Sequence, residues 1–202
     1  MAKLYFRYGA VSSAKTLNLL AVAHNYERQG KTVLVAKPAF DTRFGVQTVA
    51  SRAGLEREAD LLLTDDVTLD PAAFKACHCV LVDEAQFLTA GQVDALRELT
   101  RQAGVPVICY GLRTDFRSCL FEGSRRLMEV ADAIEEVKTT CAYCNRKAVL
   151  NLKSVDDEPT VEGPSKKLGA EELYLPVCYV HYTEKLGIED ATRLGAIRAL
   201  AS

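Results

Sequence analysis

Residues 3–16 of the chain, Lys-Leu-Tyr-Phe-Arg-Tyr-Gly-Ala-Val-Ser-Ser-Ala-Lys-Thr, hold the stretch that decides the fold. Lys3 to Tyr8 alternates in polarity, which favours a β-strand, and a glycine then interrupts it. From Thr16 to Gln29 the apolar residues recur at helical spacing, and a glycine ends the predicted helix. The continuous apolar run Thr32 to Ala36 then predicts a strand buried on both faces of a parallel sheet.

Gly9 to Thr16 lies between the first predicted strand and the first predicted helix, where a phosphate-binding loop of the pattern G-x-x-x-x-G-K-[ST] belongs. Backbone N–H groups of such a loop hold phosphate oxygens, so Lys15 is expected to reach the outer phosphates and Thr16 to bind Mg²⁺. The loop consists of Gly9, Ala10, Val11, Ser12, Ser13, Ala14, Lys15 and Thr16. The alternative is a lysine and a threonine that simply begin a helix, because Ala14 stands where the motif requires glycine. If that position needs a positive φ, alanine costs about 1–2 kcal/mol.

A second pattern supports nucleotide binding. Val80 to Glu84 is an apolar strand that ends in two carboxylates. We expect Asp83 to hold Mg²⁺ together with Thr16, and Glu84 to be free to accept a proton. Two solvated acids at a strand end are the alternative, since this dipeptide alone is common. The phosphate loop, the acidic strand end and the parallel sheet together predict ATP binding.

The seven cysteines fit a disulfide framework poorly, because their number is odd and no secretion signal precedes them. Cys141 and Cys144 form one pair with a two-residue gap, and Cys178 and His181 form a second. Three thiolates and one imidazole complete the tetrahedral shell of a structural Zn²⁺ and leave no position open for water. Coincidence of buried thiols is the alternative. The other cysteines are expected to be structural: Cys77, Cys79, Cys109 and Cys119.

The remaining elements alternate between strands and helices. In order they are a charged loop over Lys37–Ser51, a strand over Cys79–Val82, a helix over Ala90–Ala103, a strand over Val105–Tyr110 and a short helix over Gly123–Ala131. This alternation predicts an α/β fold with a parallel sheet and crossover helices. After Lys138 the pattern changes, so we expect a P-loop ATP-binding domain over 1–138 and a zinc-binding domain over 139–202. The second domain is expected to carry a tethered loop over Asp156–Ala170 and a final helix over Glu189–Leu200.

The composition excludes several classes of protein. The 202 residues are 49% hydrophobic, which excludes disorder and coiled coil. No apolar run is long enough to span a bilayer, and the first ten residues do not resemble a signal peptide, so a cytoplasmic protein without membrane contact is expected. The net charge of −2 argues against a broad nucleic-acid-binding face.

Several stretches resemble the cytosolic thymidine kinase family, the RecA-like, zinc-containing type (type II). The likeness lies in LYFRYGAVSSAKT, DTRFG, HCVLVDEAQFLT, VICYGLRTDFR and the CAYC and CYVH pairs, in the family's order and over nearly the whole chain. The resemblance implies a RecA-like core and transfer of the γ-phosphoryl group of ATP to the 5′-hydroxyl of thymidine, with Mg²⁺, to give dTMP. It implies that Glu84 is the general base.

The resemblance also implies the remaining site residues. The ATP site would include Asp41, Thr42, Arg43, Asp83, Glu84, Ala85 and Gln86. Apolar positions around thymine would be Phe87, Leu112, Phe116 and Phe121, although Phe87 and Phe121 equally suit ordinary core packing. The loop that closes over the nucleoside would contain Ser165, Lys166, Lys167, Leu168, Gly169 and Tyr174. The chain departs from the family pattern at Ala14, at Val11, where methionine is usual, and at the two lysines of the closing loop.

Two other functions compete with this one. The first is a nucleotide-binding zinc protein that regulates rather than catalyses, its phosphate loop weakened at Ala14. The second is a DNA-acting RecA-like ATPase, which the charge and the small size of the chain disfavour. A homotetramer and feedback inhibition by thymidine triphosphate (dTTP) are further expectations from the family.

Overall fold

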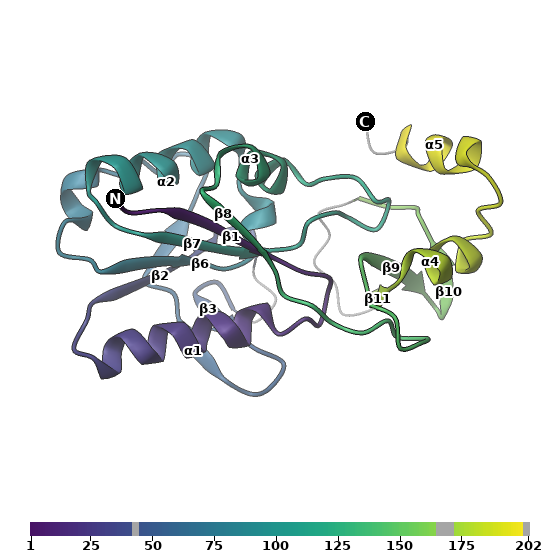
Figure 1. Cartoon of the computed structure of the whole chain (residues 1–202), viewed down its shortest axis with the longest axis horizontal. Helices are drawn as coiled ribbons and strands as arrows, with labels where there is room; N and C mark the ends of the chain where they lie inside the picture. Colours follow the sequence, from purple (N-terminus) through teal and green to yellow (C-terminus); the bar gives the residue numbers. More distant parts are fainter. Residues whose placement is uncertain (42–44, 165–171, 200–202) are drawn as a thin grey trace.

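The centre of the molecule is a six-stranded sheet in which every pairing is parallel, in the order β5-β2-β6-β7-β1-β8 (Figure 1). The computed structural model describes residues 1–41, 45–164 and 172–199. The strands of this sheet are β1 (Leu4–Tyr8), β2 (Val33–Pro38), β5 (Leu61–Leu63), β6 (Cys79–Val82), β7 (Val107–Gly111) and β8 (Ala133–Glu136). The predicted α/β fold with a parallel sheet is confirmed.

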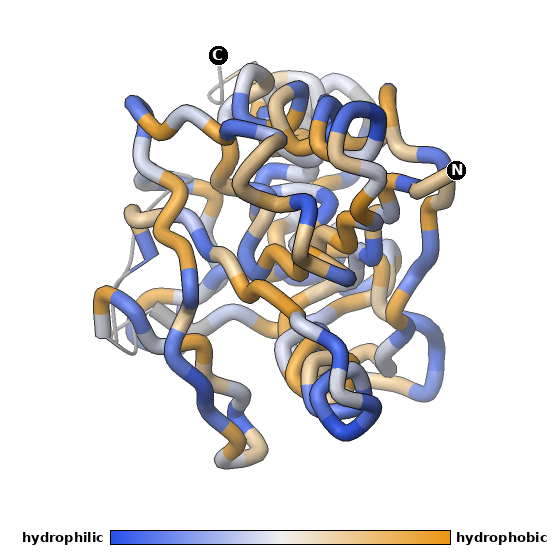
Figure 2. The backbone as a smooth tube through the Cα atoms, turned by 90° about the vertical axis from the view of Figure 1, so that its left-hand side faces the viewer, coloured by the Kyte–Doolittle hydropathy of each residue, from blue (hydrophilic) through white to orange (hydrophobic). Residues whose placement is uncertain are grey.

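Helices cover both faces of the sheet, as Figure 1 shows. On one face lies α1 (Lys15–Arg28), and on the other lie α2 (Ala90–Gln102) and α3 (Glu122–Val130). The cause is the two-residue period of a strand, since Val80 and Val82 of β6 join the core beneath α2 while Leu81 joins the core beneath α1. Hydrophobic stretches accordingly run through the middle of the molecule, and several projecting turns are largely hydrophilic (Figure 2).

The loop predicted over Lys37–Ser51 is only partly a loop. Strand β2 continues to Pro38, and β3 (Thr48–Ala50) pairs antiparallel with β4 (Glu56–Glu58) in a separate hairpin. The prediction of a charged loop fails at Lys37, although lysine is almost never fully buried unless it is paired. Its side chain is buried instead, 3.5 Å from the Asp41 carboxylate, and it donates a hydrogen bond to the Thr48 carbonyl oxygen. Two short 3₁₀ helices complete this half of the chain, η1 (Pro71–Phe74) and η2 (Ala85–Phe87).

The last third of the chain forms a smaller antiparallel sheet in the order β10-β9-β11, followed by two helices. Its elements are β9 (Leu150–Val155), β10 (Glu158–Thr160), β11 (Glu172–Val177), α4 (Tyr179–Lys185) and α5 (Ala191–Ala199). The loop predicted from Asp156 is wrong at its start, because Asp156 and Asp157 adopt φ values of 50° and 65° and turn the chain into β10. The final helix is confirmed, whereas α4 was not predicted. No helix within the described ranges is long and apolar enough to cross a membrane.

Candidate active site and metal centre

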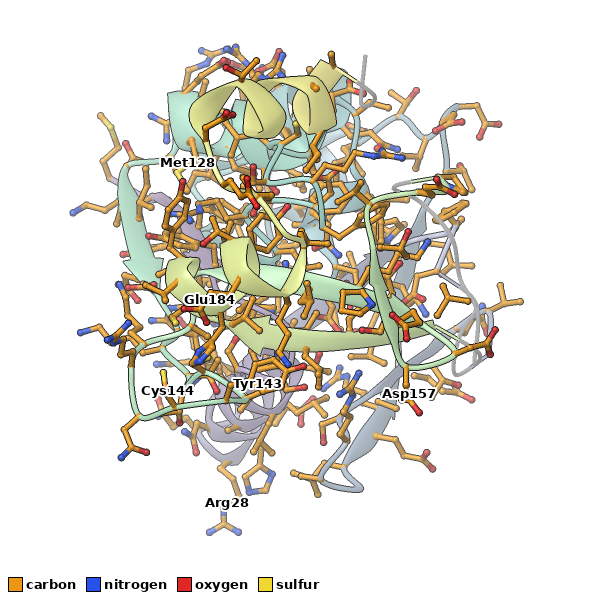
Figure 3. All side chains as sticks on the ribbon, turned by 90° about the vertical axis from the view of Figure 1, so that its right-hand side faces the viewer. Arg28, Met128, Tyr143, Cys144, Asp157 and Glu184 are labelled. Carbon is orange, nitrogen blue, oxygen red and sulfur yellow. The ribbon has the colours of Figure 1, made fainter. Side chains whose placement is uncertain are left out.

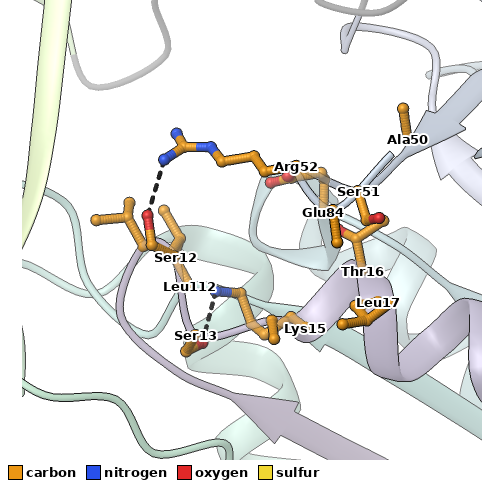
Figure 4. A pocket seen from close by; sticks show the side chains of 13 residues that line it. Ser12, Ser13, Lys15, Thr16, Leu17, Ala50, Ser51, Arg52, Glu84 and Leu112 are labelled. Atoms are coloured by element: carbon orange, nitrogen blue, oxygen red, sulfur yellow. Dashed lines mark hydrogen bonds between the residues drawn. The ribbon is translucent and has the colours of Figure 1, made fainter. Parts of the chain in front are cut away.

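Three segments meet at the carboxyl edge of the central sheet: Gly9–Thr16 after β1, Asp83–Glu84 after β6 and Leu112 after β7. They meet because neighbouring parallel strands end at the same edge, where open α/β sheets bind ligands. A pocket of about 450 Å³ lies between them and is lined by the loop together with Arg52, Glu84 and Leu112 (Figure 4).

The phosphate loop joins β1 to α1, as predicted. Ala14 adopts the left-handed conformation, with φ 61° and ψ 27°, so this position does require a positive φ. Ser12 has a φ of 59° as well. The Lys15 ammonium donates to the carbonyl oxygen of Ala10 at 2.8 Å and lies 3.2 Å from the Ser13 hydroxyl, which places its charge inside the curve of the loop (Figure 4).

The Val11 N–H group of this loop already has a partner in the last third of the chain. The Val11 N–H donates to Oδ1 of Asn151 at 2.8 Å, and Asn151 belongs to β9 in the last third of the chain. No sequence pattern predicts this contact, because a single asparagine in a strand belongs to no motif.

The Thr16 hydroxyl lies 3.0 Å from Oδ2 of Asp83, so the two predicted Mg²⁺ ligands are side by side. Asp83 is buried. Burial, and after it the negative charge of Glu84, raises the pKa of Asp83 from 3.8 to about 7, while the Thr16 hydroxyl opposes the rise. A hydroxyl and a carboxylate are oxygen ligands of the kind that Mg²⁺ takes, so this pair fits the cation.

Glu84 lines the pocket from a left-handed backbone conformation with φ 49°. Gln86 holds its carboxylate by donating from Nε2, while Oε1 of Gln86 accepts from the Leu112 N–H at 2.9 Å. Gly111 makes room for this contact, since a Cβ there would lie 2.7 Å from Oε1 of Gln86. Gln86, predicted as part of the ATP site, thus contacts Glu84 directly. Ala85, from the same prediction, is fully buried in the core beneath α2.

The predicted nucleoside residues form two groups. The Phe87 ring lies 5.7 Å from Phe121 in an edge-to-face arrangement and 5.6 Å from Phe40, which the sequence analysis did not select. The Phe116 ring lies 6.3 Å from Tyr174. Only 1% of Phe116 is exposed, and the side chains of Arg117 and Lys153 lie over its ring at 4.7 and 4.8 Å.

Some predicted residues lie outside the described ranges. They are Thr42, Arg43, Ser165, Lys166, Lys167, Leu168 and Gly169. Asp41 is described, and it is buried and paired with Lys37.

Arg52 is a pocket residue that the sequence analysis missed. It lies in the turn between β3 and β4, and its guanidinium donates to the Ser12 hydroxyl at 2.8 Å across the mouth of the pocket (Figure 4). The segment before it was predicted as a loop, so nothing indicated that a hairpin would bring an arginine to the phosphate loop.

The four predicted zinc ligands come together. The ligand atoms of Cys141, Cys144, Cys178 and His181 all lie within 4.8 Å of one another. The His181 Nδ1 atom lies 3.4 Å from the sulfurs of Cys141 and Cys178, and the Cys144 and Cys178 sulfurs are 3.9 Å apart. Tetrahedral Zn²⁺ with ordinary bond lengths separates such ligand pairs by about 3.5 and about 3.8 Å, so the cluster fits a zinc ion.

The surroundings of this cluster also suit a metal. Although burial opposes it, the N–H groups of Cys178 and Tyr143 and the His181 ring lower the pKa of Cys141 to about 6, which favours the thiolate that a metal needs. The far nitrogen of His181 lies 3.9 Å from the Glu184 carboxylate, which is too far for a hydrogen bond. Figure 3 shows Cys144 below the helix that carries Glu184.

Known proteins resemble this chain closely in sequence. A sequence family described as "Thymidine kinase" matches residues 2–182. A thymidine kinase of Lactococcus lactis is 46% identical over 187 residues, which cover 90% of this chain and 97% of the relative. Thymidine kinases of Lactiplantibacillus plantarum and Streptococcus pyogenes are 46% and 43% identical, again over 90% of this chain and at least 96% of the relative. A solved structure of Pif1 helicases on forked DNA aligns with a TM-score of 0.41 and 15% identity over 67% of this chain and 39% of that one.

Proposed function

Because the chain belongs to the thymidine kinase family, an ATP-dependent group of kinases, we propose that it transfers the γ-phosphoryl group of ATP to the 5′-hydroxyl of thymidine with Glu84 as the general base. The observation that carries the proposal is the single pocket shared by Lys15, Thr16 and Glu84, with Asp83 directly behind Thr16. A phosphate-binding loop, a pair of Mg²⁺ ligands and a carboxylate base are the parts that phosphoryl transfer to an alcohol needs.

The reaction exchanges one P–O bond for another. The 5′-oxygen of thymidine forms a bond to the γ-phosphorus while the bond from that phosphorus to the bridging oxygen of ADP breaks. The hydroxyl proton passes to the Glu84 carboxylate, which Gln86 holds at the edge of the pocket. Lys15 and Arg52 bring positive charge to the negatively charged phosphates.

Mg²⁺ would bind with ATP at Thr16 and Asp83, whose oxygen atoms lie 3.0 Å apart. When bound, the cation neutralises phosphate charge, which lowers the barrier to attack by an oxygen nucleophile. The protein would contribute to this step by holding the Thr16 hydroxyl and the Asp83 carboxylate close together beside the pocket.

On the nucleoside side we assign Phe87, Leu112 and Phe121 to the thymine contact, because Leu112 borders the pocket and the two rings pack edge to face. Phe116 would be a further thymine contact, and Tyr174, whose ring lies 6.3 Å from that of Phe116, would form the closing loop together with Ser165 to Gly169. The zinc cluster is structural in this proposal, since its four ligands leave no position for substrate.

Features of the whole protein belong to the proposal as well. They are the division into domains 1–138 and 139–202, a homotetramer, feedback inhibition by dTTP and a cytoplasmic location. The change from a parallel to an antiparallel sheet between β8 and β9 supports the division. The family resemblance is the support for the other three.

The test is a phosphorylation assay with ATP and Mg²⁺, in which thymidine is compared with deoxyuridine, deoxycytidine and uridine while ATP hydrolysis is followed in parallel. Transfer confined to thymidine and deoxyuridine is the expected result. Binding of thymidine and ATP without any transfer would contradict the proposal and favour a regulatory protein with a weakened phosphate loop. ATP hydrolysis stimulated by single-stranded DNA would contradict it in favour of a DNA-acting ATPase.

A further inference from the structure

Asn151 is a buried polar side chain that contacts two loops of the candidate active site at once. Asn151 lies on β9, and only 3% of the residue is exposed. Neither a sequence motif nor the family resemblance predicted a role for it. Its Oδ1 accepts a hydrogen bond from the Val11 N–H at 2.8 Å, and its Nδ2 donates to the Thr114 carbonyl oxygen at 2.9 Å.

Both hydrogen bonds depend on one orientation of the amide group. A backbone N–H can only donate and a backbone carbonyl can only accept, so the amide must face Val11 with its oxygen and Thr114 with its nitrogen. The opposite orientation would leave the half-buried Val11 N–H and the buried Thr114 carbonyl oxygen unsatisfied, and the loss at Thr114 alone costs about 1–3 kcal/mol. The side chain therefore fixes the relative position of two backbone atoms.

The two backbone atoms belong to opposite halves of the proposed reaction. Val11 is part of the loop that would hold the phosphates of ATP. Thr114 follows β7, in the same segment as Leu112 and Phe116 on the nucleoside side. Nearby, the Arg113 guanidinium donates to the Val149 carbonyl oxygen at 3.0 Å, so the start of β9 is held against this segment by more than one contact.

We propose that Asn151 is a positioning residue that couples the binding of ATP to the binding of thymidine. This inference rests on the proposed function, because it needs both substrates. When ATP orders the loop of Val11, the Asn151 amide is placed where the segment of Thr114 needs it, and thymidine acts in the same way from the other side. The protein therefore loses less conformational freedom when the second ligand binds. The coupling must be reciprocal, because it is a single free energy.

The test measures the affinity of the full-length protein for a non-hydrolysable ATP analogue with Mg²⁺, in the presence and in the absence of saturating thymidine. Titration calorimetry gives both values and their ratio. Two variants remove the amide: Asn151→Leu keeps the volume of the side chain, and Asn151→Ala leaves space in which water can satisfy the two backbone groups. Asn25→Ala is the matched control, because Asn25 is an exposed asparagine on α1.

In the unmodified protein and in Asn25→Ala, thymidine should strengthen binding of the ATP analogue by about fivefold or more. In both Asn151 variants the ratio should fall to about one, even where each ligand still binds alone. A merely structural role would lower the melting temperature or both affinities and leave the ratio unchanged, and that result would overturn the inference. A ratio of one in the unmodified protein would overturn it too. If the unmodified protein failed to bind thymidine at all, the proposed function itself would be wrong.

Discussion

Ala14 and Glu84 both have left-handed backbones, and they lie on two of the loops that face the pocket. A residue with a Cβ pays a steric cost in this conformation, and such strain is concentrated at functional sites because the surrounding structure holds it there. At Glu84 the conformation turns the carboxylate toward the pocket directly after a fully buried strand. At Ala14 the left-handed conformation lies at the N-cap, where the phosphate loop ends and α1 begins.

Replacing Ala14 with glycine should remove this strain. We expect Ala14→Gly to raise the free energy of unfolding by about 1 kcal/mol, since glycine adopts a positive φ freely but loses more entropy on folding. Urea denaturation measures the change. The control is Ala21→Gly in the exposed middle of α1, which should lower the free energy by about 1 kcal/mol. Destabilisation by both variants would mean that Ala14 is not strained.

Replacing Glu84 with glutamine should separate binding from chemistry. The amide keeps the size of the side chain but cannot take the proton, so kcat should fall by about 10²–10⁴ while the affinity for thymidine is largely kept. Steady-state kinetics and calorimetry together check this. Glu56→Gln is the control, because Glu56 is an exposed carboxylate on β4. Unchanged turnover in Glu84→Gln would remove this residue from the mechanism.

Among the helices and strands, those whose own residues show a clear hydrophobic pattern were predicted from the sequence, and those that depend on distant contacts were not. The strand over Cys79–Val82 was predicted to the residue, because its continuous apolar run stops abruptly at two acidic residues. The β3–β4 hairpin was missed, because a buried lysine paired with Asp41 is a tertiary arrangement that no local pattern reports. Helix α4 was also not predicted from the sequence, because it is short and begins directly after the Cys178 ligand.

The candidate site divides in the same way. The zinc ligands and the phosphate loop were found because their chemistry requires fixed spacing along the chain. Arg52, Phe40 and Asn151 were missed because each reaches the site through the fold rather than through a motif.

Removal of zinc should unfold the small sheet first. The ligand pairs flank β9, β10 and β11, so chelation is expected to lower the melting temperature and to weaken thymidine binding more than binding of the ATP analogue. Differential scanning fluorimetry and calorimetry with and without a chelator measure both effects. Cys141→Ser should behave like the chelated protein, whereas Cys119→Ser, a thiol outside the cluster, should not. An unchanged melting temperature after the metal is lost would contradict a structural role.

At the level of the whole molecule, the two sheets are joined through the segment that follows β7. The Tyr182 hydroxyl on α4, fully buried, donates to the Phe116 carbonyl oxygen at 2.6 Å. The Arg117 guanidinium donates to the Val161 carbonyl oxygen at 3.0 Å, just after β10. The segment on the nucleoside side is thus held by the C-terminal part of the chain from two directions.

Tyr182→Phe tests this junction. The variant keeps the ring but leaves the Phe116 carbonyl group buried without its donor, so the free energy of unfolding should fall by about 1–3 kcal/mol. The KM for thymidine should rise with it, because the carbonyl belongs to the nucleoside segment. Tyr179→Phe, at a tyrosine that is 54% exposed, should change neither quantity. Equal effects in the two variants would show that the hydroxyl of Tyr182 does not join the sheets.

The position of β1 within the central sheet has a consequence for how the chain folds while it is being synthesised. Leu4 pairs with Val107 and Tyr5 with Ala133, so the first strand to leave the ribosome lies between two of the last strands of the sheet. At ordinary rates of translation, roughly 6 to 26 s pass between synthesis of β1 and synthesis of β8. During that time β1 lacks both of its native strand partners, and strand pairing at such sequence separation is slow. We therefore expect a nascent chain halted before Val107 to be held by chaperones.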